Sequence, residues 1–278
     1  MTRPIRLGIS TCPNDTFVFH GLLTRAVDWR GLAFEVELLD IQQLNAGLFS
    51  HRFDVAKTSF HAALRLTAEY LVLPSGSAVG FGVGPLLLAA PNAGTPAVAT
   101  QCTLCPGAET TATLLFQLFY GDTTRVEQVV FSEIMPRLVR GDADFGVCIH
   151  EGRFTWQQHG LTLIDDLGSR WEDETRSPLA LGGLVASRGL GLEITAAVQQ
   201  VIHDSIEYAR REPANALPTM RRYAQELGDD VLMQHVELYV NDWTIDLGEG
   251  GRQALAILSQ RAAAAGIGSG QPLEVFRP

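Results

Sequence analysis

The sequence predicts an α/β protein of two lobes around a central ligand cleft. Strand-like and helix-like segments alternate along most of the chain, which is typical of sheets with parallel strands. Two apolar runs, at residues 84–90 and 179–188, flank one complete alternating unit and indicate an inserted domain. We therefore expect a large α/β domain over residues 1–88 and 182–278 and a smaller inserted α/β domain over residues 92–180.

Each element is predicted from its pattern of apolar residues. The first lobe is expected to have strands at 5–10, 34–40 and 53–58, with helices from about Thr16, at 41–49 and at 59–70. The inserted domain is expected to have strands at 102–107, 126–132, 144–150 and 161–168, with helices at 110–120 and 133–141. From about Glu193 the chain is expected to be nearly all helical, at 194–211, 216–227, 230–240 and 251–265.

The composition is that of a globular protein. The chain has 278 residues, which favours about two domains. Its net charge of −10 argues against nucleic acid or anionic lipid as a partner. No apolar stretch approaches the ~18 residues of a membrane span, and no signal-peptide pattern opens the chain, so we expect a cytoplasmic protein. Its four cysteines are then expected to be reduced thiols.

The lysine content is unusual. Among 21 basic residues, Lys57 is the single lysine. Codon preference alone would explain one lysine left by chance. The alternative is that this position requires a compact ammonium group rather than a planar guanidinium.

Polar residues gather where predicted strands lead into helices, which is where open α/β sheets bind ligands. These residues are Asp15 in the run STCPNDTF, Lys57, Thr58 and Ser59 in AKTSF, and Thr110 and Thr111 in PGAETTA. Hydroxyl groups and amides at helix starts hold anions, but the same residue types also cap helices without any ligand. Three such junctions, one with a lysine, favour a site for a small-molecule carboxylate.

His150 ends the predicted strand DFGVCIH, so we expect it at the rim of the cleft. An imidazole there could accept a proton near neutral pH, although a lone histidine is as readily structural. The other six histidines show no metal-ligand spacing, and no metal site is predicted. Cys102 and Cys105 form a C-x-x-C that lacks the second half of a zinc site, and we expect them in a strand.

Four segments together carry a resemblance to a known family. STCPNDTFVFHGLL, AKTSFHAA, PGAETTATLL and GVCIHEGRFTW resemble the 1,4-dihydroxy-6-naphthoate synthases of the futalosine route to menaquinone, from about Ile5 to Leu247. The family is similar in fold to type II periplasmic binding proteins, which implies the two-lobed layout inferred above. Gly152 and Trp156 depart from the serine and tyrosine that relatives often carry.

The resemblance implies a lyase that converts cyclic dehypoxanthine futalosine to 1,4-dihydroxy-6-naphthoate without metal or organic cofactor. His150 matches the proton acceptor of the family. The substrate-binding positions match Lys57, Thr58, Ser59, Thr110 and Thr111, and Asp15 and Asn45 match polar residues of the same cleft.

Two alternatives remain open from the sequence. One is the chorismate dehydratase of the same pathway, against which the PNDTF run speaks. The other is a small-molecule binding protein without catalysis, against which the histidine at the cleft rim speaks. The oligomeric state is not predicted.

Overall fold

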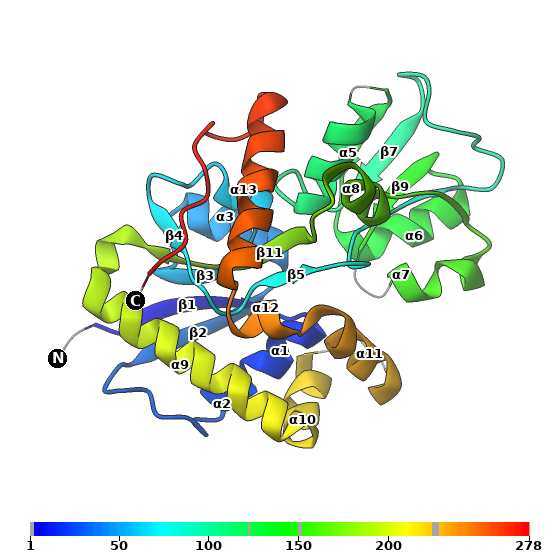
Figure 1. The fold of residues 1–278 in the computed structure, drawn as a ribbon. Coiled ribbons are helices and arrows are strands. Elements are labelled where there is room, and N and C mark those ends of the chain that lie inside the picture. The colour runs from blue at the N-terminus through cyan, green and yellow to red at the C-terminus, as the bar shows by residue number, and fades with distance from the viewer. Residues whose placement is uncertain (1–2, 122, 150–151, 224–227, 278) are drawn as a thin grey trace.

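The computed structural model describes residues 3–121, 123–149, 152–223 and 228–277, and it contains two sheets, one in each lobe (Figure 1). The chain builds most of the first lobe, crosses to the second, and returns to complete the first with a helical C-terminal part. The predicted α/β class with two lobes is confirmed.

The first sheet has six strands in the order β2-β1-β3-β11-β4, with β5 paired to β11. Their bounds are β1 Ile5–Ser10, β2 Phe34–Leu39, β3 Val55–Ser59, β4 Tyr70–Val72, β5 Ala78–Gly80 and β11 Leu179–Ser187. β1 lies parallel to both β2 and β3, whereas β11 is antiparallel to its neighbours. β3 is buried along its whole length, as expected for a strand covered on both faces.

The second sheet has five strands in the order β10-β6-β9-β7-β8. Their bounds are β6 Leu86–Ala89, β7 Cys102–Cys105, β8 Arg125–Gln128, β9 Phe145–Cys148 and β10 Thr162–Asp166. The two apolar runs predicted to cross between domains are themselves strands, β6 in this sheet and β11 in the first. The first crossing therefore falls at residues 81–85, and the predicted domain limit at residue 88 lies within a strand of the second sheet.

Helices and strands are interspersed until β11, with β4 to β7 following one another, and after β11 the helices follow one another. Those before β11 are α1 Pro13–Val18, α2 His20–Leu23, α3 Ile41–Phe49, α4 Phe60–Ala63, α5 Thr111–Tyr120, α6 Phe131–Arg140, α7 Gly152–Thr155 and α8 Leu167–Thr175. Those after it are α9 Leu192–Arg211, α10 Pro213–Tyr223, α11 Asp229–Tyr239, α12 Asp242–Ile245 and α13 Gly248–Ala264. Short 3-10 turns occupy Trp156–His159 and Arg188–Leu190. Within the described residues, no helix is both long and apolar enough to cross a membrane.

Two predicted helices differ from those observed. α1 begins at Pro13 rather than near Thr16, because proline fits the first turn of a helix, where its missing N–H has no partner to lose. The helix expected over 59–70 ends at Ala63, and the chain turns so that Tyr70–Val72 can pair with β11. Tertiary pairing outweighs the helical pattern of that segment.

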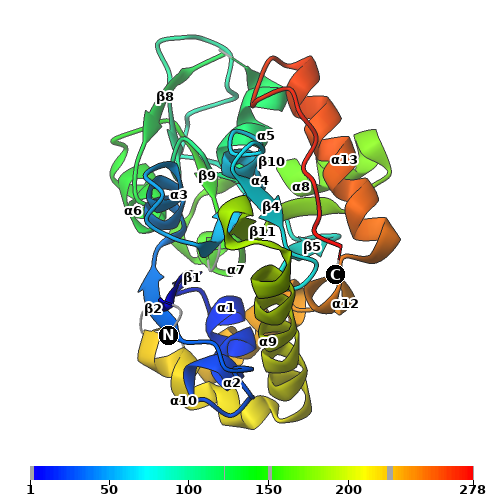
Figure 2. The ribbon, with the colours of Figure 1, turned by 90° about the vertical axis from the view of Figure 1, so that its left-hand side faces the viewer.

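α9 and α10 cover one face of the first sheet, whereas α13 packs into the other core. α9 and α10 lie beside α1 and α2 (Figure 2), and their apolar residues share one core with β1 and β11. Val198, Val201 and Ile202 of α9 are fully buried in that core. The apolar spacing of three and four residues that predicted these helices thus marks their buried faces.

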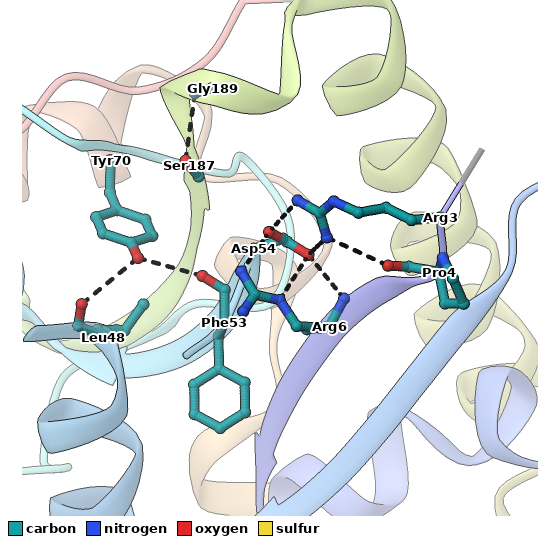
Figure 3. A network of polar contacts seen from close by, with 9 residues as sticks. All are labelled: Arg3, Pro4, Arg6, Leu48, Phe53, Asp54, Tyr70, Ser187 and Gly189. Atoms are coloured by element: carbon teal, nitrogen blue, oxygen red, sulfur yellow. Dashed lines mark hydrogen bonds and ion pairs between the residues drawn. The ribbon is translucent and has the colours of Figure 1, made fainter. Parts of the chain in front are cut away.

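An ion cluster lies at the opposite end of the first sheet from the strand ends named in the sequence analysis. Asp54, just before β3, accepts hydrogen bonds from Arg3 Nη1 at 2.6 Å and from Arg6 Nη2 at 2.9 Å (Figure 3). The Arg6 amide also donates to Asp54, at 2.9 Å. Burial by itself would raise the pKa of Asp54, but these hydrogen bonds outweigh it and hold the pKa well below its usual range. The cluster ties the start of β1 to the start of β3.

Candidate active site

A pocket lies between the two lobes and is lined by residues of both. The first lobe contributes Ser10 and Asp15 after β1, the end of β3, and Leu181 and Gly182 of β11. The second contributes Thr110, Thr111 and Ala112 at the start of α5, with Ile149 after β9. The cavity measures about 700 Å³ including its open mouth. The carboxyl ends of β1 and β3 thus meet a helix start of the other lobe, as open α/β sheets predict.

Most of the residues singled out from the sequence line this pocket. They are Asp15, Lys57, Thr58, Ser59, Thr110 and Thr111. Asn45 lies behind the pocket wall, where its side chain is fully buried. His150 lies outside the described residues, and the preceding residue, Ile149, lines the pocket.

Lys57 and Asp15 form a buried ion pair in the pocket. Lys57 Nζ donates to Asp15 Oδ1 at 2.7 Å and to the carbonyl oxygen of Gly76 at 2.9 Å. Asp15 Oδ2 accepts from Ser10 Oγ at 2.5 Å, and Asn14 Nδ2 donates to Asp15 Oδ1 at 3.1 Å. Because Asp15 neutralises Lys57, the pair brings no net charge to the pocket. An ammonium has three N–H donors, so these two bonds leave Lys57 one donor for a ligand.

Asn45 holds the end of β3 in place. Its Oδ1 accepts from Thr58 Oγ1 at 2.9 Å and from the Ser59 amide at 3.1 Å. Its Nδ2 donates to Ser59 Oγ at 3.2 Å and to the Glu109 carbonyl of the other lobe at 3.4 Å. Since Ser59 Oγ accepts this bond, its own proton is left to donate into the pocket. Asn45 is therefore a positioning residue for Ser59.

The start of α5 forms the facing wall. Thr110 is its N-cap, and Thr110 Oγ1 accepts from the Thr113 amide at 3.3 Å. The amides of Thr111 and Ala112 belong to the first turn and have no partner within the helix. They form the positive end of the dipole of this ten-residue helix. An anion between Ser59 and this helix start would meet neutral donors from both lobes.

Thr111 also bridges the lobes directly. Its Oγ1 donates to the Leu181 carbonyl of β11 at 2.5 Å and accepts from the His61 amide at 3.4 Å. His61 Nδ1 donates to the Thr110 carbonyl at 3.1 Å. Burial lowers the pKa of His61, which keeps the imidazole neutral in this role. His61 is thus a structural histidine at the interface of the lobes.

The sequence analysis missed the contribution of α11 to the pocket. His235 and Tyr239 of α11 line the cavity. They come from the helical C-terminal part, which has no strand end to mark a site. Their spacing of four residues places both on one helix face, but without the fold nothing distinguishes that face from the buried face of any other helix.

The connection at residues 81–85 closes one side of the pocket. Val83, Gly84 and Pro85 line it. A Cβ atom on Gly84 would lie 2.2 Å from the Cα of Gly168, so this close backbone contact requires glycine. Arg153 of α7, from the HEGRF motif, donates to the Gly84 carbonyl and pairs with Asp166 at 2.8 Å. Arg153 thereby attaches α7 to the crossing point between the lobes.

The cysteines do not form a metal or redox site in the described part of the chain. Cys102 and Cys105 lie in β7, as predicted, and both are buried thiols that form no disulfide. Burial raises the pKa of Cys105 to about 12, so the thiolate that a metal or disulfide exchange needs is suppressed. Among the described residues, no group of three or more potential ligands converges on one point.

The fold and the pocket define a class: two α/β lobes of the periplasmic-binding-protein fold, with a polar cavity between them. Solved structures agree. The alkanesulfonate-binding protein SsuA from Xanthomonas axonopodis pv. citri superposes with a TM-score of 0.70 at 12% identity, covering 100% of both chains. Protein AF1704 from Archaeoglobus fulgidus superposes with a TM-score of 0.88 at 29% identity, covering 95% of this chain and 98% of that one.

Sequence comparison gives the particular family. The family model for menaquinone biosynthesis matches residues 5–264. The curated 1,4-dihydroxy-6-naphthoate synthase of Thermus thermophilus is 38% identical over 98% of both chains. That of Streptomyces coelicolor is 36% identical over 95% of this chain and 94% of its own. The chain belongs to this menaquinone biosynthesis family and is one of its enzymes.

Proposed function

We propose that the protein is a carbon–carbon lyase that converts cyclic dehypoxanthine futalosine to 1,4-dihydroxy-6-naphthoate. The observation that carries the proposal is the pocket between the lobes, which offers neutral donors from both lobes beside a buried ion pair of zero net charge. The two curated relatives named as 1,4-dihydroxy-6-naphthoate synthases support the reaction. In this proposal the enzyme acts in the cytoplasm.

The substrate carboxylate binds between Ser59 and the start of α5. Ser59 Oγ donates one hydrogen bond, and the amides of Thr111 and Ala112 donate others along the helix dipole. Thr110 and Thr58 fix this geometry through their own hydrogen bonds rather than by contact with charge. The carboxylate is thereby held without an opposing full charge.

Lys57 supplies a polarising donor rather than the main counter-charge. Its charge is already balanced by Asp15, so it adds one oriented N–H from a buried position. Asp15 acts on the substrate through Lys57, because its own oxygens are occupied by Lys57, Ser10 and Asn14. Asp15 is therefore a positioning residue in this scheme.

His150 acts as the base. It removes a proton from the bound substrate, and the electron pair left behind drives cleavage of a carbon–carbon bond, release of a three-carbon fragment and aromatisation of the bicyclic ring. We predict that no metal or organic cofactor takes part. Closure of the lobes over the substrate excludes water from the reacting atoms.

The test is incubation of the purified protein, treated with a chelator, with cyclic dehypoxanthine futalosine, followed by mass analysis for 1,4-dihydroxy-6-naphthoate. Product formed without added cofactor supports the proposal. A parallel incubation with chorismate distinguishes the dehydratase of the same pathway. Saturable binding of the substrate with its recovery unchanged would contradict a lyase and favour a binding protein.

A further inference from the structure

A β-bulge in β11 lies beside the pocket. In the pairing of β11 with β5, Ala180 is opposite Val79 and Gly182 is opposite Ala78, so Leu181 is an extra residue without a partner. The pairing of β11 with β3 also begins only at Gly182. Bulges next to a site commonly change the direction of a side chain. Leu181 is therefore released from the regular alternation of its strand.

The bulge leaves part of Leu181 open to the cavity. Leu181 is half-buried and lines the pocket, whereas Leu179, Ala180 and Leu184 of the same strand are fully buried. Its buried part packs against the apolar core that contains residues of both lobes. The rest of its surface is available to a ligand in the pocket.

Two isoleucines extend this apolar surface. Ile41 at the start of α3 and Ile149 after β9 are also half-buried, pack against the same core and line the pocket. We name Leu181, Ile41 and Ile149 the apolar section of the pocket. The first lobe supplies Ile41 and Leu181 and the second supplies Ile149, so a ligand that contacts all three touches both lobes.

The apolar section adjoins the donors proposed for the carboxylate. These donors, Ser59 Oγ with the amides of Thr111 and Ala112, form the carboxylate section. Thr111 Oγ1 donates to the Leu181 carbonyl at 2.5 Å, so the bulge lies next to the carboxylate section. The part of a ligand that is attached directly to a carboxylate bound there therefore lies beside Leu181.

We propose that the apolar section binds the ring that carries the substrate carboxylate, and that Leu181 is a specificity-determining residue of the enzyme. The inference rests on the proposed function, whose product has both hydroxyl groups on one ring and the carboxylate on the other. The ring beside the carboxylate is thus a flat hydrocarbon, and its burial against aliphatic side chains is favourable without any hydrogen bond. A polar group on that ring would be left unpaired against the apolar section.

The experiment compares Leu181→Ala with the wild-type enzyme. Alanine keeps the backbone carbonyl that accepts from Thr111 and removes the side chain beyond Cβ. We expect KM for cyclic dehypoxanthine futalosine to rise about tenfold or more, as for several carbon atoms lost from an apolar contact, while kcat changes less than about threefold, as for lost uniform binding. Leu181→Met, which keeps the apolar volume, is expected to recover most of the KM. Leu181→Asn, similar in size but polar, is expected to lose as much as Leu181→Ala.

The matched control is Ile164→Ala. Ile164 is the extra residue of a bulge in β10, is half-buried and packs against the same core, but it lies outside the pocket. Its replacement is expected to leave KM and kcat unchanged.

Two further measurements separate contact from shape. Ser59→Ala should multiply KM by about the same factor in Leu181→Ala as in the wild type, because the two sections bind different parts of the substrate. The second is the affinity for 2-naphthoate, a carboxylate on a flat hydrocarbon without hydroxyl groups, measured by calorimetry. The wild type is expected to bind it, and Leu181→Ala is expected to bind it about tenfold more weakly.

The outcomes are distinct. An unchanged KM in Leu181→Ala, with the wild type active, would overturn the inference and leave the proposed function standing. A much smaller effect of Ser59→Ala in the Leu181→Ala background would overturn it too, because Leu181 would then act by shaping the carboxylate section. If the wild type makes no product but binds 2-naphthoate through Leu181, the proposed function fails and the ring contact stands. If it neither makes product nor binds 2-naphthoate, both fail. Should Leu181→Ala not fold, Leu181→Val should raise KM about fourfold, as for one carbon atom.

Discussion

The ammonium nitrogen of Lys57 lies 2.7 Å from Oδ1 of Asp15, and the side chains of the two residues are 7% and 2% exposed. The only lysine of the chain is thus held in a buried pair within the pocket. This finding favours a chemical requirement over chance for the retention of a lysine there. It also shows why STCPNDTF and AKTSF belong to one site: the first supplies the anion and the second the cation of a single pair.

The buried pair gives the first prediction. Asp15→Asn leaves the charge of the buried Lys57 uncompensated, so the free energy of unfolding should fall by about 3 kcal/mol. Turnover in the folded fraction should fall at least about tenfold, because Lys57 loses its orientation. Urea unfolding and steady-state kinetics measure the two effects. Asp173→Asn, at an exposed position on α8, is the control and should change neither. Full turnover in the folded Asp15→Asn enzyme would show that Asp15 has no role in the reaction.

Removal of the proposed base gives the second prediction. His150→Ala should abolish turnover and leave substrate binding largely intact, because a base acts in the transition state rather than in the ground state. Calorimetry with the intact substrate measures the binding. The matched control is His159→Ala, in the exposed turn nine residues further on, which should keep full activity. A lost affinity with unchanged kcat would contradict the assignment of His150.

The carboxylate section gives the third prediction. Ser59→Ala removes a donor to an anion, so KM should rise about tenfold to a hundredfold, the range expected for a charge-assisted hydrogen bond. The value of kcat should change much less. Ser132→Ala, on the exposed side of α6, serves as the control. Equal KM values for Ser59→Ala and wild type would place the carboxylate elsewhere in the cavity.

The crossing between the lobes gives the fourth prediction. Gly84→Ala places a Cβ atom 2.2 Å from the Gly168 Cα, and backbone on both sides leaves no flexible group to move. We expect a lower melting temperature and a loss of activity of about tenfold or more, because a small displacement of the lobes misplaces the catalytic groups. Gly228→Ala, where a Cβ would meet open space, should behave as wild type. A Gly84→Ala enzyme with wild-type stability and kcat would show that the contact is not needed.

The fifth prediction concerns acid stability. The folded pKa of Asp54 lies below its ordinary value because of Arg3 and Arg6, so the unfolded chain binds the proton first as the pH falls. The contribution of this group to stability is therefore complete above the unfolded pKa, about 3.9, and is lost as the pH falls below it. Asp54→Asn should be less stable at pH 7 and should lose less further stability between pH 5 and pH 3. The free energy of unfolding is measured by urea unfolding at each pH. An equal loss between pH 5 and pH 3 in both proteins would contradict this role of Asp54.

The sequence predicted those parts of the candidate site that lie at the ends of strands or the starts of helices. The junctions after β1 and β3 and before α5 were identifiable because hydroxyl and charged residues interrupt apolar runs there. Asn45 was also expected in the cleft, yet it lies behind the wall and supports Ser59, since the pattern of α3 does not tell a lining side chain from a supporting one. His235 carried no signal, because only the packing of α11 against α1 brings it to the pocket.

For the fold, too, a local pattern predicts some elements and misses those that depend on distant partners. Long helices such as α9 follow from apolar periodicity alone. The apolar run at 84–90 did not show that Leu86–Ala89 would pair with β9 and β10, because a buried strand and a crossing segment have the same composition. Whether such a segment becomes a strand depends on pairing partners distant in sequence, which a local pattern does not reveal.

Two hydrogen bonds described above, Thr111 to Leu181 and Asn45 to Glu109, join the lobes, the first at the pocket wall and the second directly behind it. The lobes cannot swing apart without breaking this wall, and the wall cannot re-form without bringing the lobes together. In the proposed reaction, opening of the lobes therefore also breaks the hydrogen bonds that hold the carboxylate of the product. If each turnover in this scheme includes one such opening, turnover cannot be faster than the separation of the lobes.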